Sequence, residues 1–325
     1  METDYIALIA RTADRDPSWK TELLKAVGSS VEPATVEAAL SSAGESLSYR
    51  IQASAEGKEL SLWHDVPLRH KDPTGKETGF LNFVCEIPKW TKKKYEIATD
   101  EAATPIKQDE KNGVLREFKT GAAGLMMNYG CFPQTWEDPE FVHPDLAAEK
   151  VGGDNDPLDV CEIGSRQIQS GSVRAVKVLG VLCMVDEGEA DWKVIAIDAG
   201  DPWAPLLDDI ADLEREWPNC VSAVREWFRD YKVADGKPQN KFGLNEECKG
   251  KEYAMQVVEE CNEAWLKLLS GEKTKTENKA IQSLSKQARP SMMQLDATQM
   301  ASFQRRGRPQ MREMDEDTPY LEEGE

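Results

Sequence analysis

The sequence of this 325-residue chain predicts an α+β fold. Two observations carry this prediction: short strand-like patterns come first along the chain, and amphipathic helical patterns follow them. Strands and helices that are segregated in this way are typical of α+β proteins. With 40% hydrophobic residues, a chain of this length can bury a sizeable core.

The first 46 residues have the pattern of a helical extension. Asp16 places a capping oxygen before Pro17, and proline is favoured at the first position of a helix. Apolar residues then follow at helical spacing: Trp19, Leu23, Leu24 and Val27. No residue in this segment suggests chemistry, so we assign residues 1–46 to a helical N-terminal extension.

Strand-like patterns occupy residues 49–97 and recur at residues 173–185 and 194–197. In the first of these segments, short apolar or alternating runs are interrupted by the turn signals Glu56-Gly57 and Asp72-Pro73. The longest apolar patches lie in the two later segments, around residues 178–185 and at residues 194–197, and both are of strand length. We therefore expect a compact β-rich region.

Amphipathic helical patterns lie near residues 207–217, 221–231 and 253–269. One face of the last helix carries Val257, Val258, Cys261, Trp265 and Leu268. After Gly271 the chain becomes polar, with a basic segment, Arg305-Arg306-Gly307-Arg308, and an acidic end. We expect a catalytic domain over residues 47–271 and a mobile charged tail over residues 272–325.

Composition excludes several classes of protein. The chain has 59 acidic and 40 basic residues, and a net charge of −19 disfavours binding to nucleic acid and to anionic membranes. No apolar run approaches the roughly 18 residues that a membrane span needs. Glu2 and Asp4 argue against a signal peptide, and seven cysteines without a CxxC pair indicate reduced thiols. We expect a cytoplasmic protein without a nucleic-acid or membrane partner.

The most informative segment is residues 153–160, Gly-Asp-Asn-Asp-Pro-Leu-Asp-Val. Its carboxylates, Asp154, Asp156 and Asp159, fall within six residues. Carboxylates this close raise one another's pKa, and a hard cation relieves the repulsion by accepting their oxygens. An EF-hand is excluded because Leu158 stands where that loop needs an oxygen ligand. The segment therefore predicts a metal site of another kind.

A second acidic turn, residues 186–191, carries Asp186 and Asp191, and Lys193 follows it. In so acidic a chain such a turn is more often a solvated surface loop, and that interpretation stays open for this segment taken alone. Both acidic segments adjoin strand-like runs. We expect their aspartates to converge on one cleft, because a shared set of cations would explain the crowding.

Residues 153–160 resemble the signature of the family I soluble inorganic pyrophosphatases. Further segments match the eukaryotic branch of that family in its order: residues 63–68, 84–91, 128–130, 132–139, 186–188, 191–198, 227–228 and 231–232. The resemblance covers roughly residues 47–270. It implies a small closed five-stranded OB-like β-barrel with flanking strands and helices, and a homodimer.

The resemblance implies hydrolysis of inorganic pyrophosphate to two orthophosphates by several Mg²⁺ ions with a metal-bridged hydroxide. Such chemistry needs paired metals that polarise phosphate oxygens and activate water. Carried over by position, the metal ligands are Asp154, Asp159 and Asp191, with Asp186 and Glu96 assisting further ions. Asp156 is the expected general base, and Glu86 is a further active-site residue.

The resemblance also implies side chains that bind the substrate. They are Lys94, Arg116, Tyr129, Lys193, Tyr231 and Lys232. Arginine can bind phosphate oxygens in a bidentate manner, and lysine acts as a compact charge. Without the family context, each of these cations would be read as a solvated surface residue and each tyrosine as a packing residue.

One departure from the family pattern concerns Leu125. The family normally has a tyrosine four residues before Tyr129, and leucine cannot donate a hydrogen bond. The loss amounts to about 0.5–1.5 kcal/mol for a neutral partner, so impaired rather than abolished catalysis is expected. The alternative function is a catalytically weakened binding or assembly subunit, with the tail contacting a protein partner. An OB-type nucleic-acid binder is improbable at this net charge.

Overall fold

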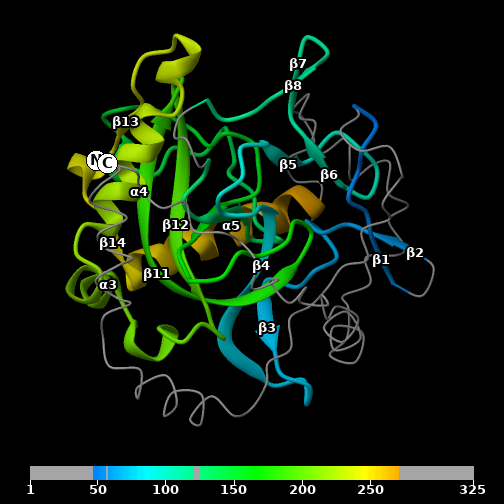
Figure 1. The fold of residues 1–325 in the computed structure, drawn as a ribbon. Coiled ribbons are helices and arrows are strands. Elements are labelled where there is room, and N and C mark those ends of the chain that lie inside the picture. Colours follow the sequence, from blue (N-terminus) through cyan, green and yellow to red (C-terminus); the bar gives the residue numbers. More distant parts are fainter. Residues whose placement is uncertain (1–46, 56–57, 120–123, 271–325) are drawn as a thin grey trace, which may run out of the picture.

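The computed structural model describes residues 47–55, 58–119 and 124–270 (Figure 1). The expected helical extension, the turn at Glu56-Gly57 and the charged tail lie outside the described residues. Within them the fold is mixed α+β, as expected: the long strands come first, and the α-helices follow Asp198. All seven cysteines are free thiols, as expected. No helix in the described part of the chain is both long and apolar enough to cross a membrane.

The main sheet contains a ring of five strands. β4 (Glu77–Ile87) pairs antiparallel with β9 (Asn128–Cys131), and β9 pairs antiparallel with β10 (Asp159–Glu162). β10 pairs in parallel with β12 (Glu189–Asp198), which pairs antiparallel with β11 (Val173–Asp186). β11 then pairs antiparallel with β4, which returns the pairing to its first strand. The two later strand-like runs of the sequence thus belong to β11 and β12, which together with β4 are the longest strands of this ring.

Short strands extend the ring. They are β3 (Arg69–Lys71), which pairs with β4, and β13 (Lys241–Phe242) and β14 (Lys249–Gly250), which pair with β11. The turn between β3 and β4 lies at Asp72-Pro73, as expected. Asp72 Oδ1 accepts hydrogen bonds from the N–H groups of Thr74 (2.8 Å) and Lys76 (3.0 Å), which fixes the turn locally.

Three small hairpins lie outside the ring among the described residues. They pair β1 (Ala53–Ala55) with β2 (Lys58–Leu60), β5 (Tyr95–Ile97) with β6 (Ile106–Gln108), and β7 (Glu110–Lys111) with β8 (Val114–Leu115). Further along the described chain are four short 3₁₀ helices: η1 (Pro144–Leu146), η2 (Ala204–Leu206), η3 (Val233–Asp235) and η4 (Leu244–Glu246). β5 carries the predicted site residue Glu96, with its neighbours Tyr95 and Ile97, into the cavity of the candidate active site.

The three expected helices are present as α3 (Ile210–Glu216), α4 (Cys220–Asp230) and α5 (Lys251–Ser270). Figure 1 shows α3 and α4 beside β11, with α5 running across the strands. The predicted apolar face of α5 is buried, with no member more than 7% exposed. Asp209, which precedes α3, accepts a hydrogen bond from the first N–H of α5 at Lys251 (3.1 Å), where a negative charge suits the helix dipole.

The ring strands β11 and β12 are covered on both faces. On β12, Val194 and Ala196 pack in the core cluster that contains α5 residues, whereas Ile195 and Ile197 pack in the cluster that contains α3 and α4 residues. Alternate residues of a strand point to opposite faces, so a strand buried on both faces is apolar throughout. This explains why residues 178–185 and 194–197 are apolar runs rather than alternating ones.

Candidate active site

Every residue that the sequence assigned to the site lines one cavity of 250 Å³. They are Glu86, Lys94, Glu96, Arg116, Leu125, Tyr129, Asp154, Asp156, Asp159, Asp186, Asp191, Lys193, Tyr231 and Lys232. The two acidic segments therefore converge: Asp186 and Asp191 line this cavity, while residues 187–189 between them are exposed, as in a surface turn. The cavity opens beside β5, β9, the start of β10 and the hairpin of β11 and β12.

The β11–β12 hairpin positions one group of acids. Asp186 lies opposite Glu189 in the strand register, and Glu187 and Gly188 form the turn with φ of 49° and 98°. A two-residue turn with both φ values positive matches the right-handed twist of the strands. Because alternate residues share a face, Glu189, Asp191 and Lys193 project to the side on which Asp186 lies. The tight turn thus places both aspartates at the mouth of one cavity.

The parallel pairing of β10 with β12 positions a second group. Asp159 lies opposite Lys193 in the register, and opposite Cys131 of β9 on the other side. Before β10, Gly153 forms an isolated parallel bridge with Ala190 of β12. A Cβ atom at Gly153 would meet the carbonyl carbon of Glu137 at 2.4 Å, so only glycine permits this approach. The segment 153–160 is therefore held edge-on against β12.

Lys193 lies at the centre of the carboxylates. Its Nζ forms ion pairs with Asp159 and Asp191 and donates a hydrogen bond to the Tyr129 hydroxyl (2.8 Å), while that hydroxyl also contacts Asp159. The lysine is only 2% exposed. Burial opposes its charge, yet the two aspartates dominate and hold its pKa well above the ordinary value. Lys193 thus stays charged and orients both carboxylates.

Three carboxylates form the tightest acidic group in the described residues. Glu137, Asp154 and Asp191 each offer one oxygen, and these oxygens lie within 4.8 Å of one another. Glu137 Oε1 accepts a hydrogen bond from the Trp192 N–H (3.0 Å), and its Oε2 has no hydrogen-bond partner in the described chain. Burial and the neighbouring Asp154 and Asp191 raise the pKa of Glu137 well above its ordinary value. Such a group suits a hard cation.

Glu137 was not among the predicted site residues. It belongs to the matched segment 132–139, in which two acids stand between a buried tryptophan and a proline. That pattern, an acid next to a buried aromatic residue in a matched segment, could have identified Glu137 from the sequence. Asp159, predicted as a principal metal ligand, lies outside this group of three but lines the same cavity as Asp154 and Asp191, where it contacts Lys193 and Tyr129.

Asp156 lies at the open side of the cavity. Its backbone N–H donates to Asp154 Oδ1 (3.0 Å), and its carbonyl accepts from the Glu137 N–H (3.0 Å). The protein atoms packed around its carboxyl group, together with the charges of Glu96 and Asp159, raise its pKa to about 7. Burial raises the pKa of Asp191 to about 7 as well, and Asp159 adds to the effect while Lys193 opposes it.

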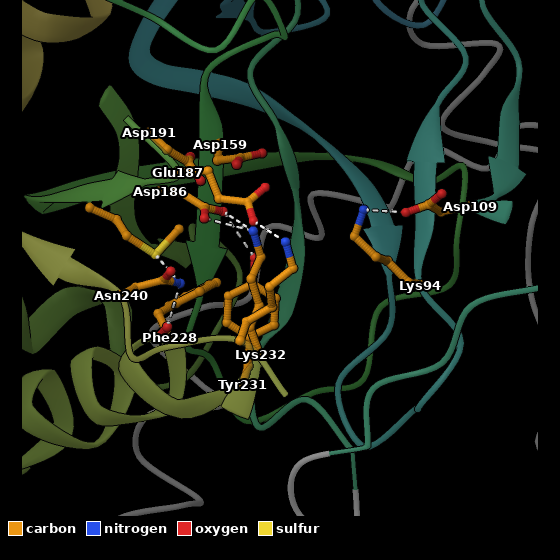
Figure 2. A network of polar contacts seen from close by, with 12 residues as sticks. Lys94, Asp109, Asp159, Asp186, Glu187, Asp191, Phe228, Tyr231, Lys232 and Asn240 are labelled. Atoms are coloured by element: carbon orange, nitrogen blue, oxygen red, sulfur yellow. Dashed lines mark hydrogen bonds and ion pairs between the residues drawn. The ribbon is translucent and has the colours of Figure 1, made fainter. Parts of the chain in front are cut away.

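The predicted phosphate-binding cations are held by carboxylates on two sides of the site. Lys94 donates to Glu96 (2.9 Å) and Asp109 (2.8 Å), and Arg116 pairs with the same Asp109 (2.5 Å). On the other side, Lys232 pairs with Asp186 (2.5 Å), and the Tyr231 hydroxyl donates to it (3.3 Å). Figure 2 shows Lys232 and Tyr231 near Asp186, with Lys94 and Asp109 apart from them. Asp109 was also missing from the prediction.

Leu125 fills the position of the missing phenol as an apolar packing residue. It is 1% exposed and belongs to the core cluster that contains Phe118, Met127 and Trp227. Met126, next in the chain, packs against the same cluster. The wall of the cavity at this point is apolar.

Comparison with known proteins supports the geometry. The sequence model of the family described as "Inorganic pyrophosphatase" matches residues 83–266. The inorganic pyrophosphatase of Schizosaccharomyces pombe is 50% identical over 227 residues, which are 69% of this chain and 76% of that protein. The inorganic pyrophosphatase of Neurospora crassa is 47% identical over 253 residues, covering 76% of this chain and 85% of the relative.

Solved structures agree. The inorganic pyrophosphatase of Schistosoma japonicum superposes with a TM-score of 0.66 at 45% identity, over 74% of this chain and 80% of that one. The N-terminally truncated vacuolar soluble pyrophosphatase of Trypanosoma cruzi, solved in complex with PPi, gives a TM-score of 0.64 at 46% identity, over 70% of this chain and 89% of that one. The family match spans more than half of the chain, and both kinds of comparison agree with it. This chain belongs to the inorganic pyrophosphatase family.

Proposed function

We propose that this cavity hydrolyses inorganic pyrophosphate to two orthophosphates. As a family member whose relatives are named inorganic pyrophosphatase at 47–50% identity, the chain is an inorganic diphosphatase. The observation that carries the proposal is the lining of one cavity by five aspartates together with three lysines and one arginine. A dense anion needs those cations, and its reaction needs carboxylates that bind metal.

The donor set fits Mg²⁺. It consists of carboxylate oxygens, which this ion prefers, and the group of Glu137, Asp154 and Asp191 gathers three of them within 4.8 Å. Asp154, Asp159 and Asp191 would hold the principal ions, with Asp186 and Glu96 assisting others. When bound, Mg²⁺ supplies positive charge beside the phosphate oxygens and makes water more acidic.

The cations of the chain bind and orient the substrate in this proposal. Lys193 stays charged at the inner end of the cavity, where Asp159 and Asp191 fix it. Lys94 and Arg116 approach from the side of Asp109, and Lys232 and Tyr231 from the side of Asp186. Tyr129 adds a hydroxyl that is hydrogen-bonded to Lys193. The two phosphoryl groups would thus be contacted from both sides, as electrostatic stabilisation of a spreading negative charge requires.

Asp156 acts as the general base. It stands at the open side of the site, where water has access, and the repulsion from Glu96 and Asp159 makes its carboxylate a better proton acceptor than an ordinary aspartate. Glu86, beneath the site, is buried, and burial together with Asp159 raises its pKa well above the ordinary value. A protonated Glu86 would add no further negative charge next to the substrate.

Several wider features belong to the same proposal. The ring of β4, β9, β10, β12 and β11 would be the five-stranded OB-like barrel that the resemblance implied, inside a catalytic domain over residues 47–271. A homodimer and a cytoplasmic location are proposed on the same ground.

The alternative, a catalytically weakened binding subunit, rested on Leu125 and on the terminal extensions. The relatives reported above give it no support, because they are named for the enzyme. Initial rates of orthophosphate release at increasing Mg²⁺ concentration test the choice, with Asp191→Asn as a variant that should need more Mg²⁺. Folded wild-type protein that binds Mg²⁺ but releases no orthophosphate would favour the alternative.

A further inference from the structure

A second cavity, of 220 Å³, lies directly behind the carboxylate group. Gly153 and Ala190 line it, whereas the next residues in sequence, Asp154 and Asp191, line the candidate active site. Gly153 and Ala190 are bridge partners, and the Ala190 N–H donates to the Gly152 carbonyl (2.7 Å). A single layer of backbone therefore separates the two cavities. We call the second cavity the rear groove.

The rear groove combines negative charge with aromatic rings. Among the described residues that line it are five with carboxylates, Glu137, Asp138, Glu140, Glu260 and Glu263, and one lysine, Lys267. Aromatic rings line the same space, and His143 makes edge contacts with Phe141 (6.4 Å between centroids) and Trp192 (5.2 Å). An arginine guanidinium pairs with carboxylates through its donor fork and stacks on aromatic faces.

The composition and the exposed surface of the rear groove indicate what kind of occupant it fits. Its acids other than Glu137, which the metal group described above uses, are Asp138, Glu140, Glu260 and Glu263, against a single lysine. At the edge of the groove, the consecutive residues Phe141 and Val142 are 47% and 41% exposed. A long polar side chain with apolar neighbours would cover both kinds of surface.

We propose that the rear groove binds the chain's own basic segment, Arg305-Arg306-Gly307-Arg308. Glu263 and Lys267 of α5 line the groove, and α5 ends at Ser270, so the chain leaves the described part of the protein beside it. The connecting residues 271–304 would span on the order of 30 Å as a flexible linker. Tethering by such a linker gives an effective concentration on the order of 1 mM.

The sequence of the segment is complementary to the groove. It places three arginines within four residues, whereas the other basic residues of the tail are dispersed. Phe303 and Met300 precede the arginines and supply apolar side chains for the exposed Phe141 and Val142. The acidic end, residues 313–325, is a competing partner for the arginines, and the experiments below distinguish it from the groove.

Hydrogen–deuterium exchange of the full-length chain tests the proposal. The test variant carries Arg305→Glu, Arg306→Glu and Arg308→Glu. The control carries Lys273→Glu, Lys275→Glu and Lys279→Glu, which change the charge of the same tail equally. We expect the backbone amides of residues 138–143 to exchange about tenfold faster in the test variant. This factor is the ratio of the effective concentration, about 1 mM, to a dissociation constant of about 0.1 mM for the segment in the groove. In the control these amides should exchange as in wild type. Unchanged exchange in the test variant, or equal changes in both, would overturn the proposal.

A fluorescent peptide with the sequence of residues 300–310 provides a second test by anisotropy. It should bind the arginine variant, whose groove is open, about tenfold more tightly than wild type, whose own segment competes. Glu260→Lys with Glu263→Lys should abolish binding, whereas Glu216→Lys with Glu226→Lys on α3 and α4 should not. Equal binding to all four proteins would mean nonspecific charge attraction. Equal binding to wild type and the arginine variant would mean that the groove takes a partner's basic segment instead, and either result contradicts the proposal.

Discussion

Asp156→Asn is the substitution that best distinguishes a loss of base catalysis from a loss of metal binding. The hydrogen bonds described at Asp156 involve its backbone, which contacts Asp154 and Glu137, so an isosteric amide leaves both intact. The side chain lies at the open side of the cavity, and Glu96 and Asp159 repel its charge. Asp156→Asn should therefore fold normally and keep most of the Mg²⁺ affinity.

The magnitude follows from the chemistry that is lost. A general base contributes about 10²–10⁴-fold to rate, which corresponds to about 3–5 kcal/mol of the activation free energy. We expect the kcat of Asp156→Asn to be about 10²–10⁴-fold lower than that of the wild type at neutral pH. The measurement is orthophosphate release at saturating pyrophosphate over a range of Mg²⁺ concentrations, with Mg²⁺ affinity measured separately by calorimetry.

Asp159→Asn is the matched control. Asp159 contacts Lys193 and Tyr129, so neutralising it leaves Lys193 with Asp191 as its carboxylate partner and weakens the site for cations. Added Mg²⁺ should restore part of the activity of this variant and none of that of Asp156→Asn. Equal losses in the two variants, both insensitive to Mg²⁺, would refute the assignment of the two roles.

Three further predictions concern other residues. Glu137→Gln should lower Mg²⁺ affinity about 10–100-fold, as loss of a supporting carboxylate does; unchanged affinity by calorimetry would exclude it from the metal group. Leu125→Tyr should raise kcat by up to about tenfold if the phenol fits the apolar wall, and a folded variant with unchanged or lower kcat would show that packing has compensated. Burial lowers the pKa of His64 to about 3, so the unfolded chain alone gains this proton below about pH 6.5. The free energy of unfolding should thus lose about 3 kcal/mol from this residue between pH 6.5 and 4, and His64→Gln should remove that slope in urea titrations.

Much of the fold was accessible from local patterns. The apolar face of α5 follows from its spacing, and the continuous apolar runs of β11 and β12 follow from burial on both faces. The closed circuit of strands was not accessible in this way. The parallel pairing of β10 with β12 joins residues more than thirty positions apart, such as Asp159 and Lys193, and no local pattern encodes such a contact.

All the residues predicted for the site line one cavity, but the sequence did not predict their contacts or all of their partners. The aspartates were identified because carboxylates crowded in sequence are unfavourable without a cation. Glu137 and Asp109 were missed because each reaches the site through tertiary packing: Glu137 through the close approach of Gly153, and Asp109 through its pairs with Lys94 and Arg116. The rear groove was missed for the same reason, since its wall and its acids come from separate segments.

The central claim is that the carboxylates and cations of one cavity hydrolyse pyrophosphate. Phosphorus NMR of the purified full-length chain with pyrophosphate and Mg²⁺ tests it most directly. The account predicts that two orthophosphates form for each pyrophosphate, so that the integrated orthophosphate signal gained equals the pyrophosphate signal lost. It also predicts that chelation of Mg²⁺ stops the conversion and that Asp156→Asn slows it at least about 10²-fold. A folded, Mg²⁺-binding chain that leaves the pyrophosphate signal unchanged would contradict it.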